Sequence, residues 1–175
     1  GHMWELYAFW AFTPVILNGY LYFHKNIDFN LSLYSFIIIA SGAISCVFSG
    51  YLSQKYTPKK VATVALTLSG LCCLLSPLIF VINSEIFFLS FFIFWGMVVI
   101  ADSPLFSTLV AQNVPNTIKG TALTIVNSIG FAITIISIQL LNSLSNNFEI
   151  RFLFLFLAVG PVIGLIELYK SLRKE

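Results

Sequence analysis

Charge is scarce in this sequence. Charged residues make up 9% of the 175 residues, whereas apolar residues make up 58%. Soluble domains carry about 25% charged and about 45–50% apolar residues. A chain with so few charges cannot cover a water-exposed surface of this size, so we expect lipid to be the solvent for much of it. The small net charge of +2 gives no indication of nucleic-acid binding.

Catalytic and metal-binding motifs are missing from the sequence as well. It contains no H-E-x-x-H motif, no G-x-S-x-G motif and no glycine-rich phosphate loop. Cys46, Cys72 and Cys73 fall inside apolar runs, without a CxxC spacing or a nearby histidine, so we expect them to be packing residues. We therefore expect no metal and no cofactor, and an enzyme is only a distant third interpretation.

Long apolar runs dominate what is present. Six of them approach the roughly 20 residues that a helix needs to cross a hydrocarbon core of about 30 Å. They lie at residues 4–23, 31–53, 61–82, 86–112, 118–141 and 150–170. We predict helices because these runs lack the alternation of barrel strands. Short polar connectors separate the runs, so the sequence predicts one all-α membrane domain over residues 4–175.

The first three residues stand apart from this domain. Gly1-His2-Met3 resembles the remnant that is left when an expression tag is cleaved off. We therefore assign His2 no functional role at this point.

Basic residues predict the orientation of the chain. Lysine and arginine are enriched in the cytoplasmic loops of membrane proteins. Seven basic residues fall on one predicted side and two on the other; the seven are Lys55, Lys59, Lys60, Lys119, Lys170, Arg173 and Lys174, and the two are Lys25 and Arg151. The asymmetry predicts six crossings of a cell (inner) membrane, with both termini in the cytoplasm.

Asp102 is the ionisable residue that the sequence places deep in a predicted span. If its helix reaches Gln112, Asp102 lies about 15 Å from the end of that helix. A carboxylate facing lipid is costly, so Asp102 is expected to face a cavity, where it would be a protonatable or ion-coordinating group. The alternative is structural, with the carboxylate bonded to backbone N–H groups that Pro104 frees.

Two prolines are expected to break predicted helices. Pro104 interrupts the run at 86–112, and Pro14 lies at a comparable place in the run at 4–23. Broken helices at corresponding places in two three-helix units are typical of transport sites, and they would make the six helices two inverted repeats. The alternative is that membrane helices tolerate these prolines without any function.

Further side chains on the first, fourth and fifth predicted helices extend the candidate path. These are Asn18, Asn127, Gln139, Trp10 and Trp95. Amides inside a membrane also serve as hydrogen-bonding contacts between helices, and that interpretation stays open for each of them.

The loop between the second and third predicted helices resembles a family signature. Its sequence, GYLSQKYTPKK from Gly50, resembles the cytoplasmic G-x-L-x-D-R-x-G-R-R pattern of the major facilitator superfamily. Gly50, Leu52, Lys55 and Lys59 agree with the pattern in type, whereas Gln54 replaces its acidic residue. In that family the loop steadies the conformation that is closed on the cytoplasmic side.

A second resemblance covers residues 101–139, which look like the tenth and eleventh helices of such transporters. Together the two resemblances imply the C-terminal six-helix half of a major facilitator fold. Membership implies alternating access, a small-solute substrate and, usually, coupling to protons.

A chain with only half of the helices of this fold is expected to have a partner. The family normally has twelve helices, so we expect the missing N-terminal half or a second copy, in addition to the lipid bilayer and an unknown small-molecule substrate. The alternative is a scaffold or assembly protein that no longer transports. The substrate, the coupling ion, the direction of transport and the oligomeric state stay open.

Overall fold

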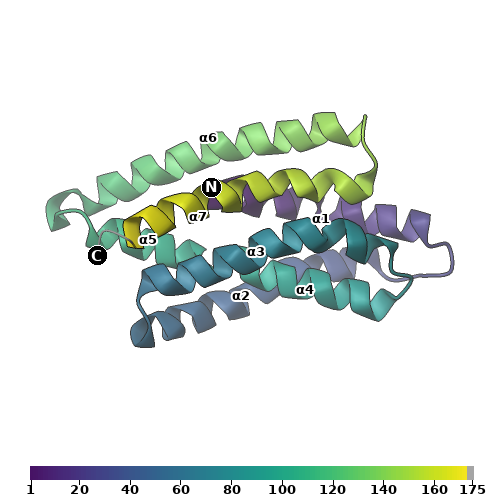
Figure 1. Cartoon of the computed structure of the whole chain (residues 1–175), viewed down its shortest axis with the longest axis horizontal. Coiled ribbons are helices and arrows are strands. Elements are labelled where there is room, and N and C mark those ends of the chain that lie inside the picture. The colour runs from purple at the N-terminus through teal and green to yellow at the C-terminus, as the bar shows by residue number, and fades with distance from the viewer. Residues whose placement is uncertain (173–175) are drawn as a thin grey trace.

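The computed structural model describes residues 1–172, which form a bundle of helices without any strand (Figure 1). In order, the helices are α1 (His2–Phe23), α2 (Leu31–Lys55), α3 (Pro58–Val81), α4 (Glu85–Ala101), α5 (Ser103–Gln112), the 3₁₀ turn η1 (Asn116–Ile118), α6 (Lys119–Ser145), the 3₁₀ segment η2 (Ile150–Ala158) and α7 (Val159–Leu172). Arg173 and Lys174, which were counted for orientation, lie outside the described residues.

Five stretches of these residues are long and apolar enough to cross a membrane. They are Leu31–Lys55, Pro58–Val81, Glu85–Gln112, Asn116–Ser145 and Ile150–Lys170. Helix α1 has 22 residues and is not among these five stretches. The fold is therefore that of a multi-pass membrane protein with five candidate spans, and a sixth crossing through α1 stays a prediction.

Small residues allow α2 and α4 to pack closely. A Cβ on Gly96 would collide with the backbone carbonyl of Ile38, and a Cβ on Gly42 would lie 3.2 Å from the carbonyl oxygen of Gly96. Ser45 Oγ donates a hydrogen bond to Met97 O at 2.5 Å across this contact. Close approach of backbones through small residues is the usual way in which membrane helices associate.

The predicted break at Pro104 is present. Helix α4 ends at Ala101, Asp102 lies between the two helices, and α5 begins at Ser103 with Pro104 in its first turn. Proline has no N–H to offer the carbonyl four residues earlier, which is that of Ile100. Cys46 Sγ on α2 lies 3.7 Å from that oxygen and is its side-chain donor.

The predicted break at Pro14 is wrong, because α1 continues through this residue. Proline removes one backbone hydrogen bond, and the rest of the helix can hold its course when neighbouring groups compensate. Thr13 Oγ1, which is buried, donates to Phe9 O at 2.7 Å in the turn before Pro14.

The last predicted helix is divided into two parts. Residues Ile150–Ala158 form 3₁₀ turns and Val159–Leu172 form an α-helix. Runs of 3₁₀ helix this long are uncommon. Gly160 and Pro161 follow the change of helix type, and the missing N–H of Pro161 leaves no α-type bond to the carbonyl of Leu157.

Aromatic side chains fill the centre of the bundle. Phe9, Phe92, Trp95 and Phe154 come from α1, α4 and η2, are at most 1% exposed, and have ring centroids 4.8–6.4 Å apart. Helices α2 and α6 lie at opposite edges of the bundle, with α1, α3 and α7 between them (Figure 1). The N-terminus lies partway along the long axis, so α1 starts inside the bundle (Figure 1).

Candidate functional site

Asp102 is buried at the junction of α4 and α5. Its side chain is 1% exposed. An aspartate at the first position of a helix usually accepts a hydrogen bond from a backbone N–H of the next turn. Asp102 makes no such bond, and only its backbone carbonyl accepts from Leu105 and Phe106. The structural alternative from the sequence, a carboxylate held by freed N–H groups, is therefore wrong.

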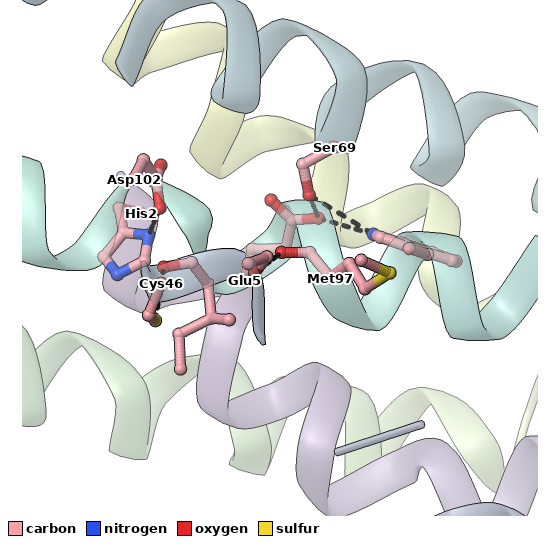
Figure 2. A network of polar contacts seen from close by, with 9 residues as sticks. His2, Glu5, Cys46, Ser69, Met97 and Asp102 are labelled. Carbon is pink, nitrogen blue, oxygen red and sulfur yellow. Dashed lines mark hydrogen bonds and ion pairs between the residues drawn. The ribbon is translucent and has the colours of Figure 1, made fainter. Parts of the chain in front are cut away.

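His2 is the group that faces this carboxylate. Its Nδ1 lies 2.6 Å from Asp102 Oδ1, an ion-pair distance, and the two side chains point toward one another (Figure 2). The His2 side chain is 9% exposed and its ring centroid lies 5.6 Å from that of Phe106. Neither Asp102 Oδ1 nor His2 Nε2 has a hydrogen bond within the described part of the chain. The sequence assigned His2 no role, yet its side chain is buried beside the deepest predicted acid.

A cavity of about 490 Å³ has His2 in its lining. Its walls come from the first three residues and from α5, α6 and α7, and they are mostly apolar. Ser107, Asn127 and Glu167 supply polar groups at its surface. Its volume lies in the range of about 300–1,000 Å³ that is typical of small-molecule sites. The cavity and the His2–Asp102 pair therefore form one candidate binding site.

A second buried carboxylate belongs to Glu5, which the sequence interpretation missed. Glu5 is 1% exposed and lies one helical turn after His2 on α1. Its Oε1 accepts hydrogen bonds from Ser69 Oγ at 2.5 Å, Trp95 Nε1 at 3.0 Å and Cys73 Sγ at 3.3 Å. These donors come from α3 and α4, so the carboxylate joins three helices (Figure 2).

One signal in the sequence could have identified Glu5. It lies inside the first apolar run, between Trp4 and the run Leu6–Trp10, where acidic residues are expensive and functional by default. It also lies close to the start of that run. Its three donors could not have been found, because Trp95 is 90 residues away in the sequence.

The remaining candidates do not gather around Asp102. Asn127 lines the cavity beside His2, but Asn18 lines a different cavity of about 730 Å³ at the other end of α1, next to Glu149 and Arg151. Gln139 is exposed on α6. Asn18 and Asn127 therefore do not line the same cavity of the bundle.

The two candidate tryptophans also differ in their surroundings. Trp95 is fully buried and donates to Glu5. Trp10 is half-buried against Tyr7, with ring centroids 5.3 Å apart, and its Nε1 has no hydrogen bond within the described residues. Trp95 is thus part of a polar network, whereas Trp10 contacts an aromatic ring.

The loop that resembles a family signature connects α2 and α3. Gly50 and Leu52 are half-buried near the end of α2, where Lys55 is exposed. A Cβ on Gly50 would meet no atom within 4 Å. Lys59 lies in the first turn of α3 and is 8% exposed.

The apolar helices, the buried carboxylates and the cavity define a multi-pass membrane protein. The sequence model of the Major Facilitator Superfamily matches residues 3–138. The chain therefore belongs to the Major Facilitator Superfamily, whose members are transporters. No curated protein matches the chain.

Proposed function

We propose that this chain is the C-terminal half of a secondary active transporter, which moves a small solute by alternating access with a proton as the coupling ion. The observation that carries the proposal is the buried Asp102 at a helix break, beside a cavity of about 490 Å³. Membership of a transporter family supplies the reaction class. Five candidate spans, with α1 proposed as the sixth, supply the membrane domain.

The neighbour pattern of the helices supports two inverted repeats. We number the proposed spans one to six as α1, α2, α3, then α4–α5, α6 and η2–α7. Span two packs on span four, and span five packs on span one. Span three packs on span four, and span six packs on span one. If spans one, two and three are exchanged with spans four, five and six, the contact of two with four becomes that of five with one. The contact of three with four likewise becomes that of six with one, as two related units predict.

The chemistry of the buried carboxylates supports proton coupling. A carboxyl group in a membrane protein can bind or release a proton when access to water changes, and it is costly to keep as an ion in an apolar medium. Glu5 lies one helical turn after His2, whose Nδ1 is 2.6 Å from Asp102 Oδ1, so the two carboxylates lie in the same part of the bundle. Protonation of one therefore changes the energy of the other, as a coupling site requires.

We further propose the arrangement in the membrane. Both termini lie in the cytoplasm of a cell with this chain in its inner membrane, and the exposed apolar faces of the bundle meet lipid and either an N-terminal half or a second copy. The distribution of lysine and arginine supports the orientation. Exposed apolar side chains on α2 and α6 support contact with lipid or another half.

Proteoliposomes test the transport proposal. We expect vesicles that contain the whole product of this gene, loaded with a pH-sensitive dye, to show solute-dependent proton movement when a panel of solutes is added. Asp102→Asn should abolish the movement, and Asp28→Asn, which alters an exposed acid in the connector between α1 and α2, should not. Absence of flux with every solute, for the chain alone and for the whole gene product, would favour the scaffold alternative.

A further inference from the structure

A second cavity lies at the C-terminal end of α1, away from Asp102. Its volume of about 730 Å³ falls within the range of about 300–1,000 Å³ that is typical of small-molecule sites. The last turns of α1, Phe80 near the end of α3, and residues 149–151 form its walls. One candidate span ends at Val81 and another begins at Ile150, so this cavity lies where the bundle meets a membrane surface (Figure 1).

Two polar side chains in this lining have groups that the bundle itself does not use. Asn18 is exposed on α1, and its amide makes no hydrogen bond within the described residues. Arg151 Nε lies 2.5 Å from Glu149 Oε2 but makes no hydrogen bond. The guanidinium lies over the ring of Phe152, 4.6 Å from its centroid, which holds its plane in place. Its Nη groups have no acceptor in the part of the chain that the structure describes.

The lining contains one positive and one negative side chain. These are Arg151 and Glu149, and their contact uses one nitrogen and one oxygen, so the second carboxylate oxygen, Oε1, is also without a partner among the described residues. The Glu149 side chain is 65% exposed, so a pair of this kind contributes little to stability and can rearrange around a ligand. An anionic ligand would be repelled by Glu149 and a cationic one by Arg151, whereas a zwitterion is attracted by both.

We propose that this cavity binds a zwitterion, with its phosphate or carboxylate on the Nη groups of Arg151 and its ammonium group at Glu149. A guanidinium binds such anions through two parallel N–H donors, and Asn18 supplies a further donor and acceptor in the same lining. The headgroup of phosphatidylethanolamine has this chemistry, and so does a free amino-acid-like solute. Tyr22 in the lining is 83% exposed, and tyrosines gather at membrane interfaces, which favours the lipid. The site is separate from the cavity beside Asp102, and binding requires no transport.

Nitrogen NMR of the guanidinium groups tests the site. The sequence contains two arginines, so ¹⁵N-arginine labelling of the full chain in maltoside micelles gives two sets of signals, which Arg173→Lys assigns. We expect short-chain phosphatidylethanolamine to shift the Arg151 signals in a saturable way. Anionic phosphatidylglycerol with the same acyl chains should bind about threefold more weakly, because it lacks the ammonium group that pairs with Glu149. Equal affinity for the two lipids would overturn the zwitterion as the ligand class.

Glycerophosphoethanolamine distinguishes the two sources of the zwitterion, because it is the same headgroup without acyl chains. If the lipid shifts the Arg151 signals at much lower concentrations than glycerophosphoethanolamine does, the ligand is a membrane lipid. If glycerophosphoethanolamine binds as tightly as the lipid, the ligand is a free solute. Both results support the zwitterion site, whereas the absence of a saturable shift of Arg151 with either probe would overturn it.

Glu149→Gln tests the role of the negative charge while the Arg151 signals remain observable. The change affects a largely exposed side chain of similar size, so we expect the variant to fold. Phosphatidylglycerol should then bind at least as tightly as phosphatidylethanolamine, because only the positive charge is left in the lining. A variant that still prefers phosphatidylethanolamine would contradict the proposal.

A matched pair of asparagine variants tests the position of the site. Asn18→Leu should weaken the binding of phosphatidylethanolamine about threefold, as expected for the loss of one hydrogen bond. Asn127→Leu, in the other cavity, should leave this binding unchanged. Equal losses for the two variants would mean that the lipid binds elsewhere and would overturn the proposal. Binding without uptake in proteoliposomes would count against the proposed transport alone.

Discussion

Two buried carboxylates near the start of α1 have opposite surroundings. Glu5 Oε1 accepts three hydrogen bonds from α3 and α4, whereas Asp102 Oδ1 has none within the described residues and faces only His2. Both side chains are 1% exposed. Equal burial therefore accompanies two different environments, a carboxylate that accepts hydrogen bonds from two other helices and a carboxylate that is paired with one histidine.

The difference can be explained by what each helix offers at that depth. Around Glu5, regular helices present side-chain donors, because Ser69, Cys73 and Trp95 project from unbroken α3 and α4. Around Asp102, the helix is interrupted before Pro104, and the carboxylate makes no capping hydrogen bond to α5. Satisfied buried networks make a structure rigid, and incompletely satisfied ones are candidates for function.

Removal of Glu5 should have the largest effect on stability. Glu5→Ala leaves the donors of Ser69 and Trp95 buried without an acceptor and leaves a void, so the free energy of unfolding should fall by about 3 kcal/mol. Glu5→Gln keeps one acceptor oxygen, and the loss should be about 1 kcal/mol. Titration with sodium dodecyl sulfate, followed by circular dichroism, measures both values. If Glu5→Ala lowers the free energy of unfolding no more than Glu167→Gln, which changes an exposed side chain, the hydrogen bonds of Glu5 do not stabilise the bundle.

Trp95 should show the next largest effect. Trp95→Phe keeps an aromatic ring in the core but removes the N–H donor to Glu5, and a hydrogen bond to a charged group contributes about 1.5–3 kcal/mol. Trp10→Phe is the matched control, because the buried Nε1 of Trp10 has no acceptor among the described residues. The same denaturant titration should show Trp10→Phe to be neutral or slightly stabilising. Equal losses for both variants would mean that ring packing, not the hydrogen bond, explains the effect.

Ser69 should contribute less than Trp95. Ser69→Ala removes one donor of three, so Glu5 retains Trp95 and Cys73, and we expect a loss of about 1 kcal/mol. Ser76 is the control on the same helix, since its hydroxyl donates only to Cys73 O. Thermal unfolding in detergent should give a higher midpoint temperature for Ser76→Ala than for Ser69→Ala. The reverse order would count against a network centred on Glu5.

Asp102 should show the smallest effect on stability and the largest on function. Asp102→Asn keeps an oxygen that can accept from His2 and removes a buried charge, so the free energy of unfolding should change by no more than about 1 kcal/mol. Stability is measured by the same titration, in parallel with the proton-flux assay. If Asp102→Asn lowers the free energy of unfolding as much as Glu5→Ala does, the two carboxylates do not differ in their contribution to stability.

The sequence predicted the helices better than their interruptions. Apolar length and the absence of strand alternation located the helices, because these properties are local. The break before Pro104 was also predicted from local chemistry, but Pro14 was given the same weight and α1 continues through it. The effect of a proline depends on which neighbouring groups satisfy the freed carbonyl, and Cys46 on α2 does so for Ile100.

The candidate site was only partly predictable. Asp102 and Asn127 were found from their depth in apolar runs, and the structure pairs Asp102 with His2, which lines the same cavity as Asn127. Glu5 and His2 were not found. The first three residues resembled a tag remnant, and Glu5 lies close to the start of an apolar run.

The sequence by itself determined the solvent and the secondary structure of this protein. Scarce charge and long apolar runs require lipid and helices, since a backbone in lipid must satisfy its own hydrogen bonds. Only the tertiary structure decided which polar groups meet. Glu5 and Trp95 are 90 residues apart and their contact depends on how three helices pack, and no spacing along the chain encodes that. The same packing brings His2 against Asp102, so the two buried acids became distinguishable only in the folded bundle.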